Sequence, residues 1–308
     1  MYRQNGQLAR AAGEYERVAS ESSDPDLQGE ALLVAGELFE QSGSSERALA
    51  AYQRYVGQFP RPIDAAIETH FKIAGLHQAA HDEARYLEAL GQIVRIDAEA
   101  GAERTSRTRT LAARSALVLS EQLYREFAAY ELRQPFDTSL PEKKRLMDAS
   151  VAAFERLLDY EIGEVTAAAT YYLAEIYIGF SRSLLASERP PGMTGAQLEE
   201  YELALDEEAF PFEEQAIAVH EKNLELLRQG NHNAWTGKSL ARLAELVPVR
   251  YAKDELSSGY LGSLERYAYV IPVVPQSASA EQPPPEPRQT TGVGPGADER
   301  EVSLAGAR

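Results

Sequence analysis

Residues 29–62 read GEALLVAGELFEQSGSSERALAAYQRYVGQFPRP, and this stretch decides the fold that the sequence predicts. Small and apolar side chains recur at helical spacing in its first half, at Leu32, Ala35, Gly36 and Phe39. Gly43 interrupts the pattern, and Pro60 closes a second helical stripe formed by Ala48, Tyr52 and Tyr55. The stretch therefore predicts two paired helices joined by a turn.

The sizes of four residues in this unit indicate how the two helices pack. We expect Gly36 and Ala48 to be small because the helix backbones approach each other closely there. The rings of Phe39 and Tyr52 are expected to fill the space beside them. The unit therefore has a core of alternating small and large side chains.

The same spacing of small and apolar residues recurs along the chain, which is typical of a repeat protein. Residues 63–97 repeat it without interruption, and two later pairs repeat it with an insertion between their helices. The first helices are marked by Ile73, Ala74 and His77, by Ala116, Leu119, Ser120 and Leu123, and by Leu173, Ala174 and Tyr177. The second helices are marked by Tyr86, Leu90 and Ile93, by Ser150, Phe154 and Leu157, and by Ala216, Ile217, His220, Asn223 and Leu224.

The unit at residues 29–62 resembles the tetratricopeptide repeat, a helix–turn–helix of about 34 residues. The residues at that family's signature positions are Leu32, Gly36, Phe39, Gly43, Ala48, Tyr52 and Pro60. The resemblance implies an all-α solenoid of helical hairpins with inserted helices. Gly6, Ala11, Tyr15 and Val18 fit the end of a repeat whose first helix would precede Met1, so we expect a longer array; a lone capping helix is the alternative.

The resemblance also implies where partner proteins bind, because ligand segments of this family contact first-helix residues in a concave groove. By position, those residues are Glu30, Leu33, Glu37, Glu40 and Gln41, then Glu68, Phe71 and Gln78, and finally Tyr171, Glu175 and Ile178. Carboxylates and aromatic rings together favour a basic or amphipathic partner segment. Ordinary surface is the alternative interpretation for each residue.

Residues 110–255 are similar to a narrower bacterial family, the envelope tetratricopeptide proteins associated with gliding-type motor machineries. The stretches that carry this likeness include TYYLAEIYIGFSRSLLASERP and WTGKSLARLAELVPVRYAKDE. The likeness implies a non-catalytic scaffold in the cell envelope or periplasm. A cytoplasmic peptide-binding adaptor is the alternative if Met1 is the true start, because no apolar signal follows it.

Composition sets the domain plan and narrows the classes of partner. The predicted parts are repeats at 1–104, divergent helical pairs at 105–255, a packing segment at 256–274 and a disordered Pro/Gly-rich tail at 275–308. The net charge of −17 argues against nucleic-acid or anionic membrane partners. No apolar run reaches about 18 residues, which argues against membrane insertion.

Candidate chemical sites have simpler structural explanations. His70, His77 and His81 could hold a metal ion if one helical face carried them all, but the helix is expected to end before His81. HNAWTGKS lacks the first glycine of a phosphate loop. The acidic stretch Glu199–Glu214 is interpreted as the solvated face of an inserted helix, with docking of a basic segment as the alternative. We therefore predict no enzyme activity, no metal and no cofactor.

Overall fold

The computed structural model describes residues 7–230 and 232–252. Every regular element in these residues is helical, which confirms the prediction of an all-α protein. Gly6, the predicted packing segment at 256–274 and the predicted tail at 275–308 lie outside the described residues.

Eleven α-helices and one short 3₁₀ helix make up the described part of the chain. They are α1 (Leu8–Glu21), α2 (Pro25–Gln41), α3 (Ser45–Gln58), α4 (Ile63–Ala79), α5 (Glu83–Glu99), η1 (Gly101–Glu103), α6 (Ser106–Ala129), α7 (Phe136–Leu158), α8 (Gly163–Leu185), α9 (Gly195–Arg228), α10 (Ala234–Leu246) and α11 (Pro248–Tyr251).

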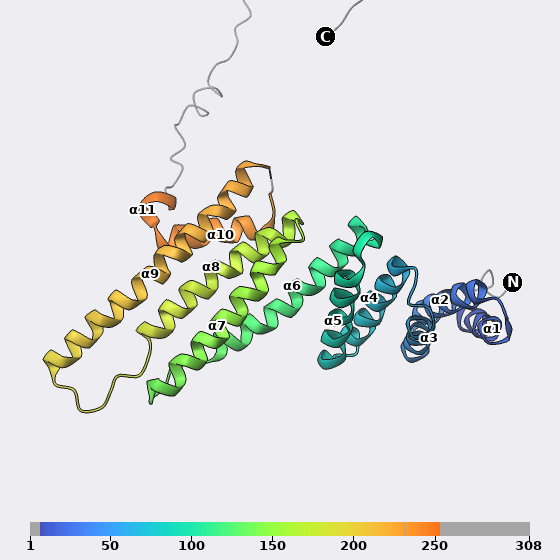
Figure 1. The fold of residues 1–308 in the computed structure, drawn as a ribbon, viewed down its shortest axis with the longest axis horizontal. Coiled ribbons are helices and arrows are strands. Elements are labelled where there is room, and N and C mark those ends of the chain that lie inside the picture. Colours follow the sequence, from blue (N-terminus) through green and yellow to red (C-terminus); the bar gives the residue numbers. More distant parts are fainter. Residues whose placement is uncertain (1–6, 231, 253–308) are drawn as a thin grey trace, which may run out of the picture. The chain divides into compact units, whose positions relative to one another are not determined.

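Each helix of residues 7–252 packs on the next, and the helices α4, α6, α8 and α10 also contact one another in that order. We call α2, α4, α6, α8 and α10 the first helices, and α3, α5, α7 and α9 their second helices. Figure 1 shows α6, α7, α8 and α9 lying side by side. The chain is therefore a succession of helical pairs in which the first helices from α4 onward form one row.

Local signals place the ends of α2 where the sequence predicts them. The side chain of Asp24 accepts a hydrogen bond from the backbone N–H of Asp26, and Pro25 starts the helix. Gly43 follows the last turn with a φ of 75°, a conformation that is costly for other residues. The predicted turn between the two helices of this pair is confirmed.

Gly36 is small for a different reason from the one expected. A Cβ atom added there would overlap the ring of Tyr52, which is fully buried against α2. The close approach is therefore between an aromatic ring and a helix backbone, and not between two backbones. Phe39 is also fully buried, in the same apolar cluster as Tyr52.

The insertions lengthen existing helices, which corrects the prediction of separate inserted helices in this part of the chain. Helices α6, α7 and α8 have 24, 23 and 23 residues, and α9 has 34, whereas α3 has 14. Helix α9 runs through Pro211, which has no N–H to donate. Pro211 and Glu207 are both exposed, so water can bond to the carbonyl that loses its partner.

Candidate functional site

Most of the predicted partner-binding residues on α2 and α4 are accessible. Glu30, Glu37, Glu40, Gln41, Phe71 and Gln78 are exposed, and Leu33 and Glu68 are partly exposed. We call these eight residues the first-helix face. Phe71 has 45% of its surface exposed. The face therefore offers an exposed aromatic ring, Phe71, and the partly exposed Leu33 among polar residues.

The first-helix face is less acidic than the sequence indicated, because neighbouring helices supply cations. Lys72 on α4 lies 2.6 Å from a carboxylate oxygen of Glu37 on α2. Arg107 on α6 pairs in the same way with Glu68 on α4. These bridges are solvent-exposed, so each contributes at most about 1 kcal/mol to stability. Their larger effect is to neutralise two of the carboxylates that were expected to attract a basic partner.

Glu40 is engaged as well, through the core of its own helical pair. The hydroxyl of Tyr52 donates a hydrogen bond of 2.9 Å to a carboxylate oxygen of Glu40. Burial, and then this bond to Glu40, raise the pKa of Tyr52 well above its ordinary value. The carboxylate of Glu40 therefore has a structural role in addition to its exposed position.

A polar hollow of about 490 Å³ adjoins the α4 end of the first-helix face. Gln78 belongs to both, since it lies seven residues from Phe71 and so on the same side of α4. The other lining residues come from the α4–α5 turn, α5 and α6: His81, Glu83, Tyr86, Val118, Glu121, Gln122 and Arg125. This hollow extends the accessible face from α4 toward α6 with hydrogen-bonding side chains.

The third set of predicted binding residues, on α8, is less accessible than the first two. Ile178 is buried, with 3% of its surface exposed. Both oxygens of Glu175 accept hydrogen bonds from Arg242 on α10, at 2.6 and 2.9 Å. The ring of Tyr171 lies 5.5 Å from that of Trp235 on α10. The expectation that Ile178 is accessible was wrong because its side chain is buried, and Glu175 is engaged by Arg242 of α10.

Glu175 belongs to a buried polar cluster that joins α8, α9 and α10. His220 Nε2 lies 3.4 Å from a carboxylate oxygen of Glu175, and His220 Nδ1 lies 3.2 Å from the Ser239 hydroxyl. Asn223 donates to that hydroxyl at 2.8 Å and to the Ala167 carbonyl at 3.0 Å. The cluster consequently fixes the positions of three helices through directional hydrogen bonds.

The sequence of contacts Ser239–His220–Glu175 resembles a nucleophile–base–acid triad in its residue types. Ser239 and His220, however, have no exposed surface. Burial alone would raise the pKa of Glu175, but the adjacent His220 and the hydrogen-bonded Arg242 outweigh it and lower the pKa to about 2. The geometry is that of a structural ion-pair network.

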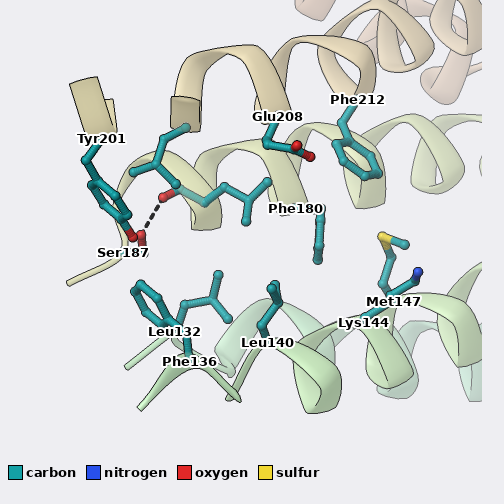
Figure 2. Close-up of a pocket in the computed structure, with 12 residues that line it drawn as sticks. Leu132, Phe136, Leu140, Lys144, Met147, Phe180, Ser187, Tyr201, Glu208 and Phe212 are labelled. Atoms are coloured by element: carbon teal, nitrogen blue, oxygen red, sulfur yellow. Dashed lines mark hydrogen bonds between the residues drawn. The ribbon is translucent and has the colours of Figure 1, made fainter. Parts of the chain in front are cut away.

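The lengthened helices α7, α8 and α9 line an apolar cavity that the sequence analysis missed. We call it the end pocket; its volume is about 370 Å³ (Figure 2). Its walls come from residues preceding and within α7, from the last turns of α8 and from the first half of α9. The lining residues are Leu132, Phe136, Leu140, Lys144, Met147, Phe180, Leu184, Ser187, Tyr201, Leu205, Glu208 and Phe212.

A buried lysine, Lys143, connects α7 to the end of α6. Lys143 has 1% of its surface exposed, and its Nζ donates to the carbonyls of Phe127 and Tyr130 at 2.7 and 2.8 Å. These carbonyls lie at the C-terminal end of α6, where the last carbonyls lack the N–H donors that a continuing helix would supply. Burial lowers the pKa of Lys143 to about 8. Lys143 thereby ties α7 to the end of α6.

The three candidate metal-binding histidines do not share one helical face. Helix α4 ends at Ala79, and His81 follows it with a φ of 56°. His77 is buried, as its place in the repeat requires. Across the described residues, no group of three or more histidines or carboxylates is arranged to hold a metal ion.

No protein-family model matches the chain, and no curated protein matches it either. None of the helices in the described residues combines the length and apolarity needed to cross a membrane.

Proposed function

We propose that this chain is a non-catalytic scaffold of the tetratricopeptide type, which binds segments of partner proteins on its first-helix face. The observation that carries the proposal is Phe71, a large aromatic residue left 45% exposed on a first helix. The ordered packing of helical pairs and the burial of the signature residues Phe39 and Tyr52 support the repeat type. A partner that covers Phe71 would remove apolar surface from water.

The charges of the face favour a segment of mixed polarity. Glu37 and Glu68 are paired with Lys72 and Arg107, so each bridge offers both a donor and an acceptor to an incoming chain. Glu30 and Gln41 are exposed beside them. We therefore propose an amphipathic partner segment with one large apolar anchor, flanked by basic and hydrogen-bonding residues.

The absence of catalysis and of a cofactor is part of the same proposal. The described residues place their most enzyme-like constellation, around His220, inside the helix packing. The setting that we propose, a bacterial envelope assembly, rests on the resemblance of the sequence to envelope tetratricopeptide proteins. The particular partner is to be recovered by pull-down from native extracts.

Phe71→Ala is expected to speed dissociation of the recovered partner about tenfold or more and to change the association rate little, because a buried anchor holds a complex once it has formed. Glu30→Lys combined with Glu37→Lys should mainly slow association at low salt, because peripheral charges steer the encounter. Glu46→Lys with Glu88→Lys is the matched control, since both carboxylates are exposed on second helices. Surface plasmon resonance at low and high salt measures these rates.

Wild-type kinetics in Phe71→Ala and in the Glu30/Glu37 variant would exclude the first-helix face as the binding site. If the Glu46/Glu88 control slowed association equally, the net charge of the protein alone would explain the effect.

A further inference from the structure

The first half of α9 has two sides of different character. Its inner side packs on α8 and lines the end pocket, where the centroid of the Phe212 ring lies 4.7 Å from that of Phe180 (Figure 2). The lining residues of this side recur at spacings of four and three: Tyr201, Leu205, Glu208 and Phe212.

A second series with the same spacing runs along the other side of α9. It consists of Leu203, Glu207, Phe210 and Glu214, and we call it the outer face of α9. The two series are offset by two positions, which is about 200° around a helix of 3.6 residues per turn. The outer face therefore points away from the end pocket.

The outer face carries two large apolar residues that remain accessible. Leu203 and Phe210 are 60% and 56% exposed, and they lie seven residues apart. In the described residues, the hydrogen bonds between α9 and α10 are made by His220 and Asn223, nearer the C-terminal end of α9. Apolar residues at a spacing of seven are the pattern by which one helix packs along another. The outer face therefore presents a helix-packing stripe whose apolar residues are uncovered.

Carboxylates occupy the positions between and beside these apolar residues. Residues 190–219 contain no lysine or arginine. The exposed carboxylates of the outer face and its borders are Glu199, Glu200, Asp206, Glu207 and Glu214. In the part of the chain that the structure describes, the cation Arg189 pairs with Glu202 instead, and none of these five carboxylates has a cation partner. The apolar stripe is consequently surrounded by uncompensated negative charge.

This combination of charge and apolar spacing selects among the possible occupants. A second copy of the outer face would bring carboxylates against carboxylates, and a nucleic acid or an anionic lipid surface would also be repelled. A helix with apolar residues every seven positions would cover Leu203 and Phe210. Lysine or arginine three or four positions from those apolar residues would then lie opposite Glu207 and Glu214.

We propose that the outer face of α9 is a second docking site, which takes a basic amphipathic helix of a partner protein. The partner helix lies along α9 and removes Leu203 and Phe210 from water. The stretch of α9 from Glu199 to Glu214 is roughly 24 Å long at 1.5 Å per residue, so about four turns of the partner helix are engaged. This site lies on the opposite side of α9 from the end pocket and does not depend on the first-helix face.

The probe is a fluorescein-labelled peptide of roughly 16 residues, with leucine at every seventh position and lysine three and four positions after each leucine. One comparison peptide has glutamate in place of every lysine. A second has the same composition as the probe in an order that lacks the stripe. Fluorescence anisotropy should show binding of the probe, at least about tenfold weaker binding of the glutamate peptide, and at least about fivefold weaker binding of the reordered peptide.

Two pairs of substitutions test the outer face itself. Leu203→Ser with Phe210→Ser, and Glu207→Lys with Glu214→Lys, should each weaken binding of the probe about fivefold or more. All four side chains are exposed, so the fold should be retained, and circular dichroism checks this.

Three controls should bind the probe like wild type. Glu46→Lys with Glu88→Lys changes the net charge by the same amount at exposed positions on α3 and α5. Leu205→Ser alters the end pocket on the opposite side of α9. Phe71→Ala alters the first-helix face, so this experiment can fail or succeed independently of the binding proposed for that face.

Several results would overturn the proposal. Wild type that does not bind the probe, or binds the reordered peptide equally well, would exclude a site for an amphipathic helix. Equal weakening in the Glu46/Glu88 control would reduce the interaction to general acidity. Unchanged binding in the Leu203/Phe210 pair, or weakening by Leu205→Ser or Phe71→Ala, would place the peptide elsewhere. Self-association or sedimentation with phosphatidylcholine vesicles that is lost in the Leu203/Phe210 pair, without binding of the probe, would assign the face to a second copy or to a membrane.

Discussion

Phe154→Ala and Tyr52→Ala are each expected to lower the free energy of unfolding by about 3–5 kcal/mol, the usual cost of truncating a large buried aromatic residue. Both residues lie on second helices with no exposed surface. The Phe154 ring stacks on Tyr172 of α8 with centroids 4.9 Å apart. Removing Tyr52 leaves a void beside Gly36, which has no side chain to fill it. Urea unfolding followed by circular dichroism measures both effects.

Phe71→Ala is the matched control for these two variants, because it removes an aromatic ring that is already 45% exposed. Its free energy of unfolding should change by less than about 1 kcal/mol. If Phe154→Ala and Tyr52→Ala unfolded at the wild-type urea concentration, the assignment of their rings to the core between helical pairs would be wrong.

Arg242→Met should destabilise the protein by about 3–5 kcal/mol at neutral pH, because it leaves the Glu175 carboxylate in a largely buried place without its main partner. The Glu175 side chain is 11% exposed and the Arg242 side chain 18%. Arg145→Met is the surface control: it removes an ion pair with Glu142 whose side chains are 63% and 40% exposed, so its effect should stay below about 1 kcal/mol.

The effect of Arg242→Met should depend on pH in a definite direction. The folded-state pKa of Glu175 is about 2 and its ordinary value is 4.5, so its ionised form stabilises the wild-type fold above pH 4.5 and this contribution is lost as the pH falls toward 2. Without Arg242, the carboxylate takes up a proton at higher pH. The difference in unfolding free energy between wild type and variant should therefore narrow below about pH 5. If the difference in unfolding free energy stayed constant from pH 7 to pH 3, Glu175 would not be its cause.

The helical pairs α2–α3 and α4–α5 follow from local signals in the sequence. Gly43 and Pro60 mark where a turn and a helix end are needed, and the phase of Phe39 and Tyr52 indicates which side of each helix is buried. These signals depend on neighbouring residues alone, so the turn, the helix end and the buried side can be predicted from a single sequence. Position in the tetratricopeptide repeat, carried over by resemblance, placed Phe71 and Gln78 on the accessible side of α4, where the structure has them.

The later pairs show where such reasoning fails. The stretch containing Pro211 was expected to form a separate inserted helix. It is instead part of one continuous helix, α9, which packs against α8. Glu175 and Ile178 were assigned by repeat position, but Arg242, which engages Glu175, lies 67 residues away. The end pocket joins Leu132, Phe180 and Tyr201, and nothing local connects them. Long-range packing decides all three outcomes.

The most direct test of the scaffold account is site-specific photo-crosslinking in native cells. A benzoylphenylalanine at Phe71 or Gln78 reports on the first-helix face, and one at Glu88 reports on an exposed part of the second helix α5. We expect the first two positions to yield a crosslinked product of higher mass that contains a discrete partner protein, and Glu88 to yield none. Crosslinks at Glu88 alone, or none at Phe71 and Gln78 while the partner still co-purifies, would contradict binding through the first-helix face.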